Sequence, residues 1–447
     1  MNERNPAISK GVDWSLVWIF FLLALIGVTA IFAATYKEGD PIIQSFLRFK
    51  TDYSKQFYYF IIAAVIGFFI LLTDSKFFAA TANLWYVFGI FLLLLVFPFH
   101  SRVKGTESII RMGGIQFQPA EFCKITVALA LAKYLSRAET NFTTIRSQLI
   151  AAILVLFPAG LSILQSETGL ALVYCAFFIV MYREGMPSLV LIVGFAIAVL
   201  VVATIVIEPN TLAIILTIIA ALAIYFLRRQ IKRRRGILTI IVLLWFVCVG
   251  IQRFAVPFAF KKILQKHQVE RIYSLFGKDN PYKKNEGEVI ETPTKKKDDA
   301  NVSSYNVKQS KIAIGSGELW GKGLLKGTQT RYDFVPEQRT DFIFCTVGEG
   351  FGFAGSIFLL AIYLILLFRI VAIAERQRST FSRAYAYGVA SVFFFHIVIN
   401  VAMTVGLAPV IGIPLPFISY GGTSFLTFTI LLFILIRLDA DRQMVLR

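Results

Sequence analysis

The chain has 447 residues, 57% of them hydrophobic and 15% aromatic, and its mean hydropathy is +0.70. A water-soluble globule of this size would not tolerate that composition on its surface, so the sequence predicts an integral membrane protein. The formal net charge of +18 is explained by the basic cytoplasmic loops of such proteins, so nucleic-acid binding is not predicted. The four cysteines lie in or beside apolar segments without metal-ligand spacing, which predicts no disulfide framework.

Twelve apolar segments are predicted to be transmembrane helices, because about 20 residues cross a bilayer. In chain order they are residues 14–34, 57–73, 77–97, 121–135, 149–164, 168–181, 188–207, 211–227, 236–251, 342–370, 384–405 and 423–436. Backbone exposed to lipid must satisfy its hydrogen bonds internally, so residues 1–447 are predicted to form a single all-α, polytopic membrane domain. The first segment is interpreted as a retained helix, since no small-residue cleavage site follows it.

A basic cluster between the eighth and ninth segments sets the predicted topology. Six of the eight residues from Arg228 to Arg235 are basic, and such a cluster belongs on the cytoplasmic side. Counting helices from it places both termini in the cytoplasm and residues 252–341 outside, as a large extracytoplasmic loop. A Lys-rich run at about residues 280–300 of this loop lacks apolar periodicity and is predicted to be a flexible insertion.

Ionisable residues gather at the helix ends that this topology places outside. A charged side chain near the bilayer centre costs about 2.5 to 3.5 kcal/mol on insertion scales, so such residues are candidates for function. If the helices bundle, five of them converge into an outward-opening polar cleft: Glu121, Lys124, Glu167, Asp341 and Glu349.

Each candidate also has a purely structural interpretation. Glu121 and Lys124 are three residues apart and could pair on one helix face. Glu167 could end a helical hairpin, and Asp341 could be the N-cap of the following helix. Glu349 is harder to explain in this way, because it lies about two turns into an apolar run.

Three more polar side chains leave alternatives open. Arg331 and Arg339 are either solvated loop charges or, beside Gly-rich backbone, ligands for a phosphate. His396 stands alone in an aromatic helix, where a hydrogen-bonded core histidine is the favoured interpretation over a catalytic one.

The segment GIPLPFISYGG, residues 412–422, is predicted to be a broken element that lines the cleft. Pro414 and Pro416 forbid a regular helix, and Gly421 and Gly422 permit backbone conformations that other residues avoid. Irregular backbone at membrane depth is tolerated where it is buried in protein or faces a cavity.

Several of these stretches resemble one known family. The segments VPEQRTDFIF, QSKIAIGSGELWGKG and NVAMTVGLAPVIGIPLPFISYGGTS closely resemble the SEDS family of cell-wall proteins, which includes RodA, FtsW and SpoVE. RMGGIQFQPAEFCK resembles the family's fourth-helix signature, and QSETGLA is a divergent form of its QPDLGTA. The GKG, GTQ and GIPLP elements are most similar to the RodA, cell-elongation type. The resemblance implies a core of ten helices, to which residues 211–251 add an extra hairpin.

The resemblance implies a peptidoglycan glycosyltransferase that polymerises lipid II, an undecaprenyl-pyrophosphate-linked disaccharide peptide, at the outer face of the bacterial cytoplasmic membrane. The acceptor 4-hydroxyl would attack the donor's anomeric carbon and displace undecaprenyl pyrophosphate with inversion. A carboxylate would serve as general base, and cations would stabilise the leaving group. No cofactor is assigned from the sequence, and a divalent cation at the pyrophosphate stays an open alternative.

The resemblance also implies roles for individual residues. The family's essential aspartate corresponds to Asp299 when residues are counted back from Tyr305, or to Asp279 when they are counted forward from RIYSLFG; Asp299 is slightly preferred. The expected substrate-binding residues are Arg111, Lys124, Glu167, Glu337, Arg339, Asp341, Glu349, Ser419, Gly421 and Gly422. The chain departs from the family pattern at Arg339, where a histidine is usual, and at Gly350, where a second glutamate is usual.

The implied partners are a class B penicillin-binding protein, which cross-links the new strand, and the elongation machinery. The penicillin-binding protein would dock on the apolar outer faces of the family's helices eight to ten. Two alternatives remain: a lipid II flippase and a non-catalytic scaffold of wall synthesis. Against a transporter, the sequence has no internal repeat, and its candidate residues share one membrane face rather than the midplane.

Overall fold

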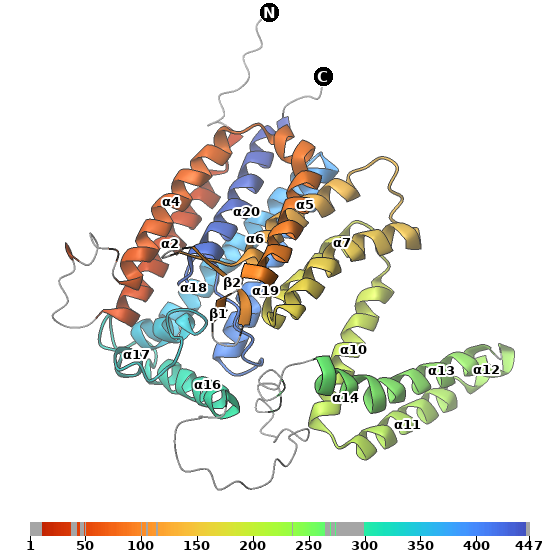
Figure 1. Ribbon diagram of the computed structural model, residues 1–447. Helices are drawn as coiled ribbons and strands as arrows, with labels where there is room; N and C mark the ends of the chain where they lie inside the picture. The colour runs from red at the N-terminus through yellow and green to blue at the C-terminus, as the bar shows by residue number, and fades with distance from the viewer. Residues whose placement is uncertain are drawn as a thin grey trace, which may run out of the picture. The chain divides into compact units, whose positions relative to one another are not determined.

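The computed structural model describes residues 11–36, 43–44, 49, 51–99, 101–103, 106–112, 115–234, 236–263, 269, 273 and 299–443 (Figure 1). The chain forms two compact units. The first comprises Met1–Met186 and Asn306–Arg447, and the second comprises Pro187–Tyr305. The prediction of a single membrane domain with its large outer loop stays a prediction.

The first unit is a helical bundle with a small sheet. Its helices are α2 (Trp14–Thr35), α4 (Asp52–Leu72), α5 (Ser75–Phe99), α6 (Pro119–Leu135), α7 (Ile145–Leu164), α8 (Thr168–Tyr174), α9 (Phe177–Arg183), α17 (Thr328–Arg331), α18 (Ile343–Arg376), α19 (Thr380–Thr404), α20 (Gly422–Ala440) and the 3₁₀ turn η3 (Asp441–Gln443). Helix α20 lies at its centre and packs against α4, α6 and α19 (Figure 1).

Aromatic side chains fill the core around α20. Phe20, Phe393, Phe417, Phe425 and Phe428 are all buried. Phe20 and Phe417 meet edge to face with ring centroids 5.3 Å apart, and Phe393 meets Phe428 in the same way at 5.3 Å. Edge-to-face pairs contribute stability beyond the area they bury, so this cluster fixes the helices that carry the site.

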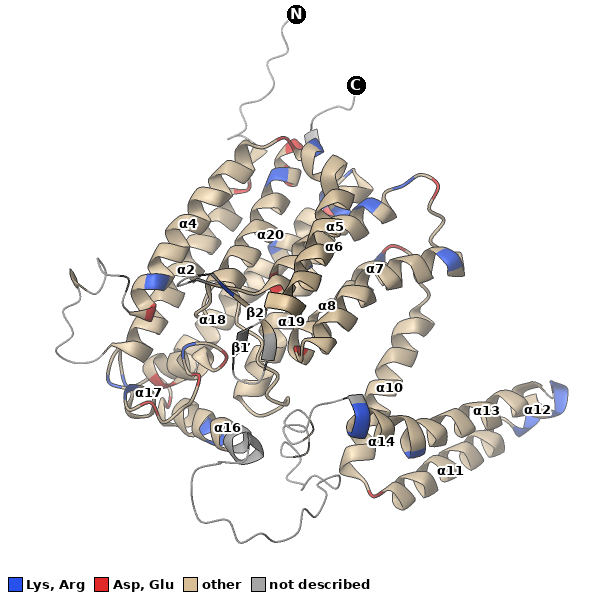
Figure 2. Cartoon of the chain, in the orientation of Figure 1, with Lys and Arg blue, Asp and Glu red and all other residues tan. Residues whose placement is uncertain are grey.

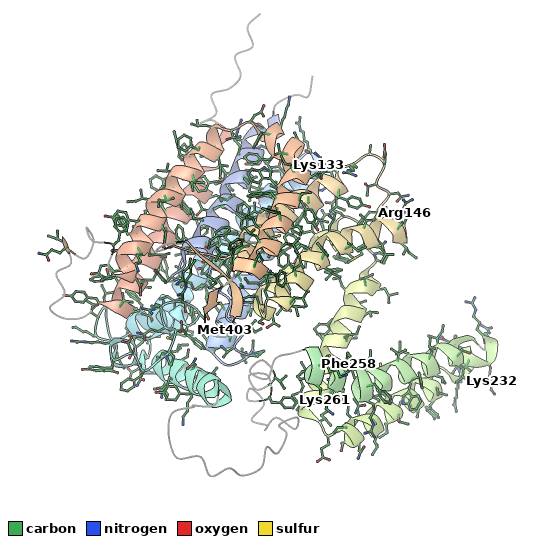
Figure 3. All side chains as sticks on the ribbon, viewed as in Figure 1. Lys133, Arg146, Lys232, Phe258, Lys261 and Met403 are labelled. Carbon is green, nitrogen blue, oxygen red and sulfur yellow. The ribbon has the colours of Figure 1, made fainter. Side chains whose placement is uncertain are left out.

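The second unit contains the extra hairpin. Its helices are α10 (Ser188–Val206), α11 (Pro209–Phe226), α12 (Arg228–Arg233) and α13 (Gly236–Gly250), the last continued by η1 (Ile251–Ala255), α14 (Val256–Phe258) and η2 (Ala259–Ile263). Lys232 and the other cations of α12 are exposed at the tip of the hairpin (Figure 3). Helical structure thus continues to residue 263, past the predicted end at 251, since residues 251–263 wind as π- and α-helix.

All twelve predicted segments are helical in the structure. Among the described residues, ten helices are long and apolar enough to cross a membrane. The exceptions are α6, which has 17 residues, and the short apolar stretch Thr168–Arg183. The all-α polytopic fold is confirmed, and the count of twelve spans stays a prediction.

Two elements were not predicted. The loop before α6 forms an antiparallel sheet of β1 (Ser101–Val103), β2 (Thr106–Met112) and β3 (Ile115–Phe117), which lies against α5, α6 and α20. Residues 299–316, treated as the end of the insertion and as loop, form α16 (Asp299–Ser316). Its buried face uses the small residues Ser310 and Ala313, so it lacks the apolar stripe that marks an amphipathic helix.

Acidic and basic residues gather at the end of the first unit where α20 ends (Figure 2), and ion pairs connect the helices there. Asp13, just before α2, accepts hydrogen bonds from Arg369 and Arg376 near the end of α18. Arg376 also pairs with the fully buried Asp439 near the end of α20, which Arg442 joins at 2.9 Å. The start of the first described helix and the end of the last therefore lie at the same end of the bundle.

Candidate active site

The predicted broken segment is present and connects α19 to α20 without regular helix. Its main chain is held by side chains from neighbouring elements. The Tyr363 hydroxyl donates to the Pro416 carbonyl at 2.5 Å, and Asn400 Nδ2 donates to the carbonyls of Ile413 at 2.7 Å and Asp341 at 2.9 Å. The buried Ser419 Oγ accepts from the Leu415 N–H at 2.8 Å. The segment, called the broken segment below, is therefore held in place by hydrogen bonds from both α18 and α19.

A row of buried polar side chains connects the broken segment to α6. Lys124 is fully buried, and its Nζ lies 2.6 Å from the carboxylate of Glu121, which is also buried. The same Nζ lies 2.8 Å from His396 Nε2 and 5.2 Å from the centre of the Phe428 ring. The (i, i+3) spacing of the glutamate and the lysine thus gives an ion pair inside the bundle and not on a solvated helix face.

The hydrogen bonds of His396 fix its tautomer. Nδ1 lies 3.0 Å from the Pro414 carbonyl, which can only accept, so Nδ1 carries the proton. Nε2 is then free to accept from the Lys124 ammonium. A neutral His396 therefore links a buried cation on α6 to the broken segment, in agreement with the predicted hydrogen-bonded core histidine.

A second carboxylate lies beside the sheet. Glu167 is the N-cap residue of α8, and its Oε1 accepts from the buried Ser108 hydroxyl at 2.5 Å and from Gln118 Nε2 at 3.0 Å. Thr423, at the start of α20, donates to the Gln116 carbonyl at 3.0 Å. The sheet thus joins Glu167 to the end of the broken segment.

The stretch before α18 also contacts the broken segment. The Tyr420 N–H donates to the Arg339 carbonyl at 2.9 Å, and the half-exposed Arg339 guanidinium pairs with Asp52. Burial raises the pKa of the Tyr420 hydroxyl, and the nearby Asp52 charge raises it further. Glu337 has φ of +59° and accepts from the Thr340 hydroxyl at 2.9 Å.

Glu349 is fully buried at the beginning of α18. Its carboxylate accepts from Lys322 Nζ and from the Gln329 N–H, each at 2.9 Å, and from the Thr330 N–H at 2.8 Å. These donors lie in the Gly-rich stretch between α16 and α18, and Gln329 and Thr330 belong to the short helix α17 within it.

The structure therefore brings most of the predicted site residues together around residues 405–421. Arg111 lies on β2 opposite Gln116 of β3, with an exposed side chain. Asp299 is the first residue of α16, but its side chain lies outside the described part of the chain, as does all of Asp279. The assigned roles stay predictions. Within the described residues no group of three or more His, Cys, Asp or Glu side chains could hold a metal ion.

Several residues of this constellation were missed from the sequence. Ser108, Gln56, Asn400 and Tyr363 contact carboxylates or the broken backbone through uncharged groups, so no cost of burying a charge marks them. The main signal available was polarity: Asn400 is a buried amide in an otherwise apolar stretch of α19.

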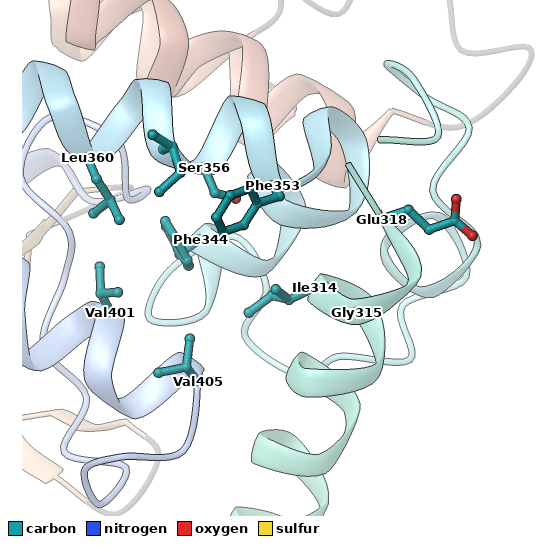
Figure 4. A pocket seen from close by; sticks show the side chains of 10 residues that line it. Ile314, Gly315, Glu318, Phe344, Phe353, Ser356, Leu360, Val401 and Val405 are labelled. Atoms are coloured by element: carbon teal, nitrogen blue, oxygen red, sulfur yellow. The ribbon is translucent and has the colours of Figure 1, made fainter. Parts of the chain in front are cut away.

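An apolar pocket of about 420 Å³ opens between α16, α18 and α19 (Figure 4). Ile314 lines it from α16, Phe353 and Leu360 from α18, and Val401 and Val405 from the end of α19. Glu318 is the charged residue of its lining.

Comparisons with known proteins agree with this architecture. The family model described as "Cell cycle protein", for FtsW, RodA and SpoVE, matches residues 13–235 and 195–444. The peptidoglycan glycosyltransferase RodA of Treponema pallidum is 28% identical over 96% of this chain and 97% of its own length. The peptidoglycan glycosyltransferase MrdB of Escherichia coli K12 is 29% identical over 76% of this chain and 72% of its own length.

Solved structures show the same fold. A chain from a study of how a peptidoglycan synthase complex coordinates polymerization and crosslinking superposes with a TM-score of 0.66 at 22% identity, over 97% of this chain and 99% of its own. Thermus thermophilus RodA superposes with a TM-score of 0.60 at 21% identity, over 97% of this chain and 98% of its own. The protein is a member of the FtsW/RodA/SpoVE family of membrane proteins.

Proposed function

We propose that this protein is a peptidoglycan glycosyltransferase that polymerises lipid II into glycan strands at the outer face of the cytoplasmic membrane during cell elongation. Family membership and the names of its relatives support the activity. The observation that carries the proposal is the buried chain from Glu121 through Lys124 and His396 to the broken segment, because it holds in place the segment that contacts the half-exposed cation Arg339.

The contacts support different roles for the site residues. Lys124 is held by Glu121 and His396 inside the bundle, so this neutral ion pair links α6 to the broken segment and does not itself reach the substrate. Arg339 is half exposed beside Tyr420, so it is the cation placed to meet the pyrophosphate. The general base is Asp299, with Asp279 as its alternative; either carboxylate would accept the proton of the attacking 4-hydroxyl.

Purified protein with fluorescent lipid II tests this proposal. We expect glycan ladders from the unmodified chain and their loss in either Asp299→Ala or Asp279→Ala, with Asp298→Ala as the matched control that keeps activity. Movement of lipid II across vesicles without any polymer would overturn the proposal in favour of a flippase, and neither activity would favour a scaffold.

We further propose a class B penicillin-binding protein as partner, within the elongation machinery. Its membrane helix would dock on the apolar pocket between α16, α18 and α19. Of these, α18 and α19 belong to the family's helices eight to ten, which the resemblance assigned to docking. Leu360→Trp fills this pocket and should weaken co-purification of the two proteins, whereas Ile365→Trp, at an exposed position of the same helix, should not. Equal binding by both variants would place the partner elsewhere.

The proposed topology puts the described ends of the bundle in the cytoplasm. Asp13 and Asp439 share Arg376, so the N-terminal end of α2 and the C-terminal end of α20 lie on the same side of the membrane. Reporter fusions at the two termini should therefore both give cytoplasmic signals.

A further inference from the structure

Helix α18 is broken near its start. Gly352 has φ of +67° and ψ of −162°, which no helix contains. A break of this kind leaves carbonyl groups before it and N–H groups after it without helical partners. In this chain those groups are satisfied by another segment.

The main chain of residues 318–323 fills the break. The N–H groups of Lys322 and Gly323 donate to the carbonyls of Glu349 and Gly350 at 3.0 and 2.9 Å. The N–H groups of Phe353 and Ala354 donate to the carbonyls of Glu318 and Leu319 at 2.8 and 3.0 Å. The loop and the broken helix thus complete each other through four main-chain hydrogen bonds.

Two glycines of the loop are required by this approach. A Cβ on Gly317 would overlap the carbonyl oxygen of Gly348 and would come within 3.2 Å of Glu349 Cα. Gly321 has φ of +79°, and a Cβ there would overlap the carbonyl of Gly350. Backbone packed on backbone leaves no flexible side chain to move aside, which explains why this loop is rich in glycine.

The buried Glu349 carboxylate collects the rest of the loop. Oε1 accepts from Lys322 Nζ and the Gln329 N–H, and Oε2 accepts from the Thr330 N–H. Two hydroxyls lie farther away: Thr328 Oγ1 at 3.4 Å and Ser316 Oγ at 3.5 Å from Oε1. Five donors from the chain itself face this carboxylate.

The loop is joined in turn to the site. Gln338 Nε2 donates to the Thr330 carbonyl at 2.7 Å and to the Ala34 carbonyl at 3.1 Å. The main-chain carbonyl of the next residue, Arg339, accepts a hydrogen bond from the Tyr420 N–H on the broken segment. A continuous path of hydrogen bonds thus runs from Glu349 through Thr330 and Gln338 to the segment that carries Arg339.

We infer that Glu349 is a positioning residue, which holds the 322–330 loop and through it the Arg339 segment, and does not itself contact the substrate. The kinetic part of this inference rests on the proposed function. It assigns a different role to Glu349 from the substrate-binding role expected from the resemblance. The Lys322 ammonium and the Glu349 carboxylate act as one unit in this role, with Lys322 reaching Thr328 as well at 2.9 Å.

Two substitutions and one matched control test the inference. Glu349→Gln replaces one of the two acceptor oxygens of the carboxylate by an NH₂ group. That NH₂ group then faces hydrogen-bond donors and cannot accept from them. Lys322→Met removes the cation from the other side of the pair. Lys326→Met removes an exposed cation from the same loop and serves as the control.

The readouts are the initial rate against lipid II concentration and limited chymotrypsin cleavage after Leu324 and Tyr332, which are exposed in the loop. Glu349→Gln and Lys322→Met should both lower kcat by about tenfold or more, with little change in KM, because they misplace Arg339, which in the proposed function stabilises the leaving pyrophosphate in the transition state. Both should speed cleavage at the two loop sites, and Lys326→Met should do neither.

Three results would overturn the inference. A raised KM in Glu349→Gln with unchanged loop cleavage would show that the carboxylate binds lipid II. Unchanged kcat in Lys322→Met, which keeps the test valid if Glu349→Gln fails to fold, would remove the proposed unit. Cleavage that rises throughout the chain would show a general structural role. Failure of the proposed function is distinguishable, because it abolishes polymer in the unmodified chain and leaves the cleavage results intact.

Discussion

Removing one member of the buried Glu121–Lys124 pair should destabilise the protein far more than removing both. Lys124→Met leaves the Glu121 carboxylate, which is 1% exposed, without its cation. Breaking a buried ion pair in this way costs about 3 to 5 kcal/mol, because an uncompensated charge remains. Glu121→Gln should cost less, since His396 Nε2 and the Phe428 ring still face the ammonium.

The double substitution Glu121→Gln with Lys124→Met removes both charges. Replacing a buried pair by neutral groups of similar volume is often close to neutral, so the two single effects should not add, and the coupling should be roughly 2 kcal/mol or more. The assay is the free energy of unfolding of the four proteins in mixed detergent micelles.

The exposed pair of Arg183 and Glu375 is the control for this cycle. Its nitrogen and oxygen lie 3.0 Å apart, but the side chains are 48% and 52% exposed, so solvent screens the interaction. The same cycle at this pair should give a much smaller coupling. A coupling at the buried pair no larger than at the exposed one would refute the conclusion that Lys124 and Glu121 are a charged, desolvated pair.

Three further predictions concern the loop, the ion-pair network and the broken segment. Gly317→Ala should destabilise the protein by about 1 to 3 kcal/mol in the same unfolding assay, because its Cβ overlaps the Gly348 carbonyl, whereas Gly315→Ala, with open space around it, should not. Burial alone raises the pKa of Asp13, but hydrogen bonds and charges from Arg369 and Arg376 outweigh it and hold the pKa below its ordinary 3.8. The stability lost in Asp13→Asn should therefore be fully present above about pH 5 and should decrease as the pH falls below 3.8 toward the lowered pKa of the folded state. A stability difference that does not decrease as the pH falls below 3.8 would contradict that assignment. Ser419→Ala should cost about 1 to 3 kcal/mol of unfolding free energy, because it leaves a buried N–H without an acceptor, and Ser419→Thr should recover part of the loss.

Hydropathy located the helices well, because each long apolar run has one way to satisfy its backbone in lipid. It failed at α16, whose buried face is made of Ser310, Ala313 and the adjoining Gly317. Small residues bury a helix through close backbone approach, and this leaves no apolar period to detect. The sheet before α6 was missed for a related reason: its strands have three to seven residues, too short for an alternating pattern to stand out.

The candidate site could be proposed from the sequence as a set of residues but not as a set of contacts, and its roles stay predictions. Charge and broken backbone identified Lys124, Glu167 and the 412–422 segment. The partner of Lys124 across the bundle, His396, lies 272 positions away in sequence, and no local pattern connects the two. Glu349 was identified by its charge, but two of the five donors around it are main-chain N–H groups, which every residue has and no sequence displays.

The break at Gly352 also bears on where the membrane begins. As one straight helix, the 34 residues of α18 would be roughly 51 Å long, against a hydrocarbon core of about 30 Å. Residues 353–376 alone would extend roughly 36 Å and are sufficient to cross it. Glu349 then belongs to a short cap above the hydrocarbon, and the glycine marks the level at which lipid gives way to protein and water. Lengthening the helix by one turn after Gly352 would shift the cap, the glycine-rich loop and the Arg339 segment together, relative to the lipid substrate that we propose.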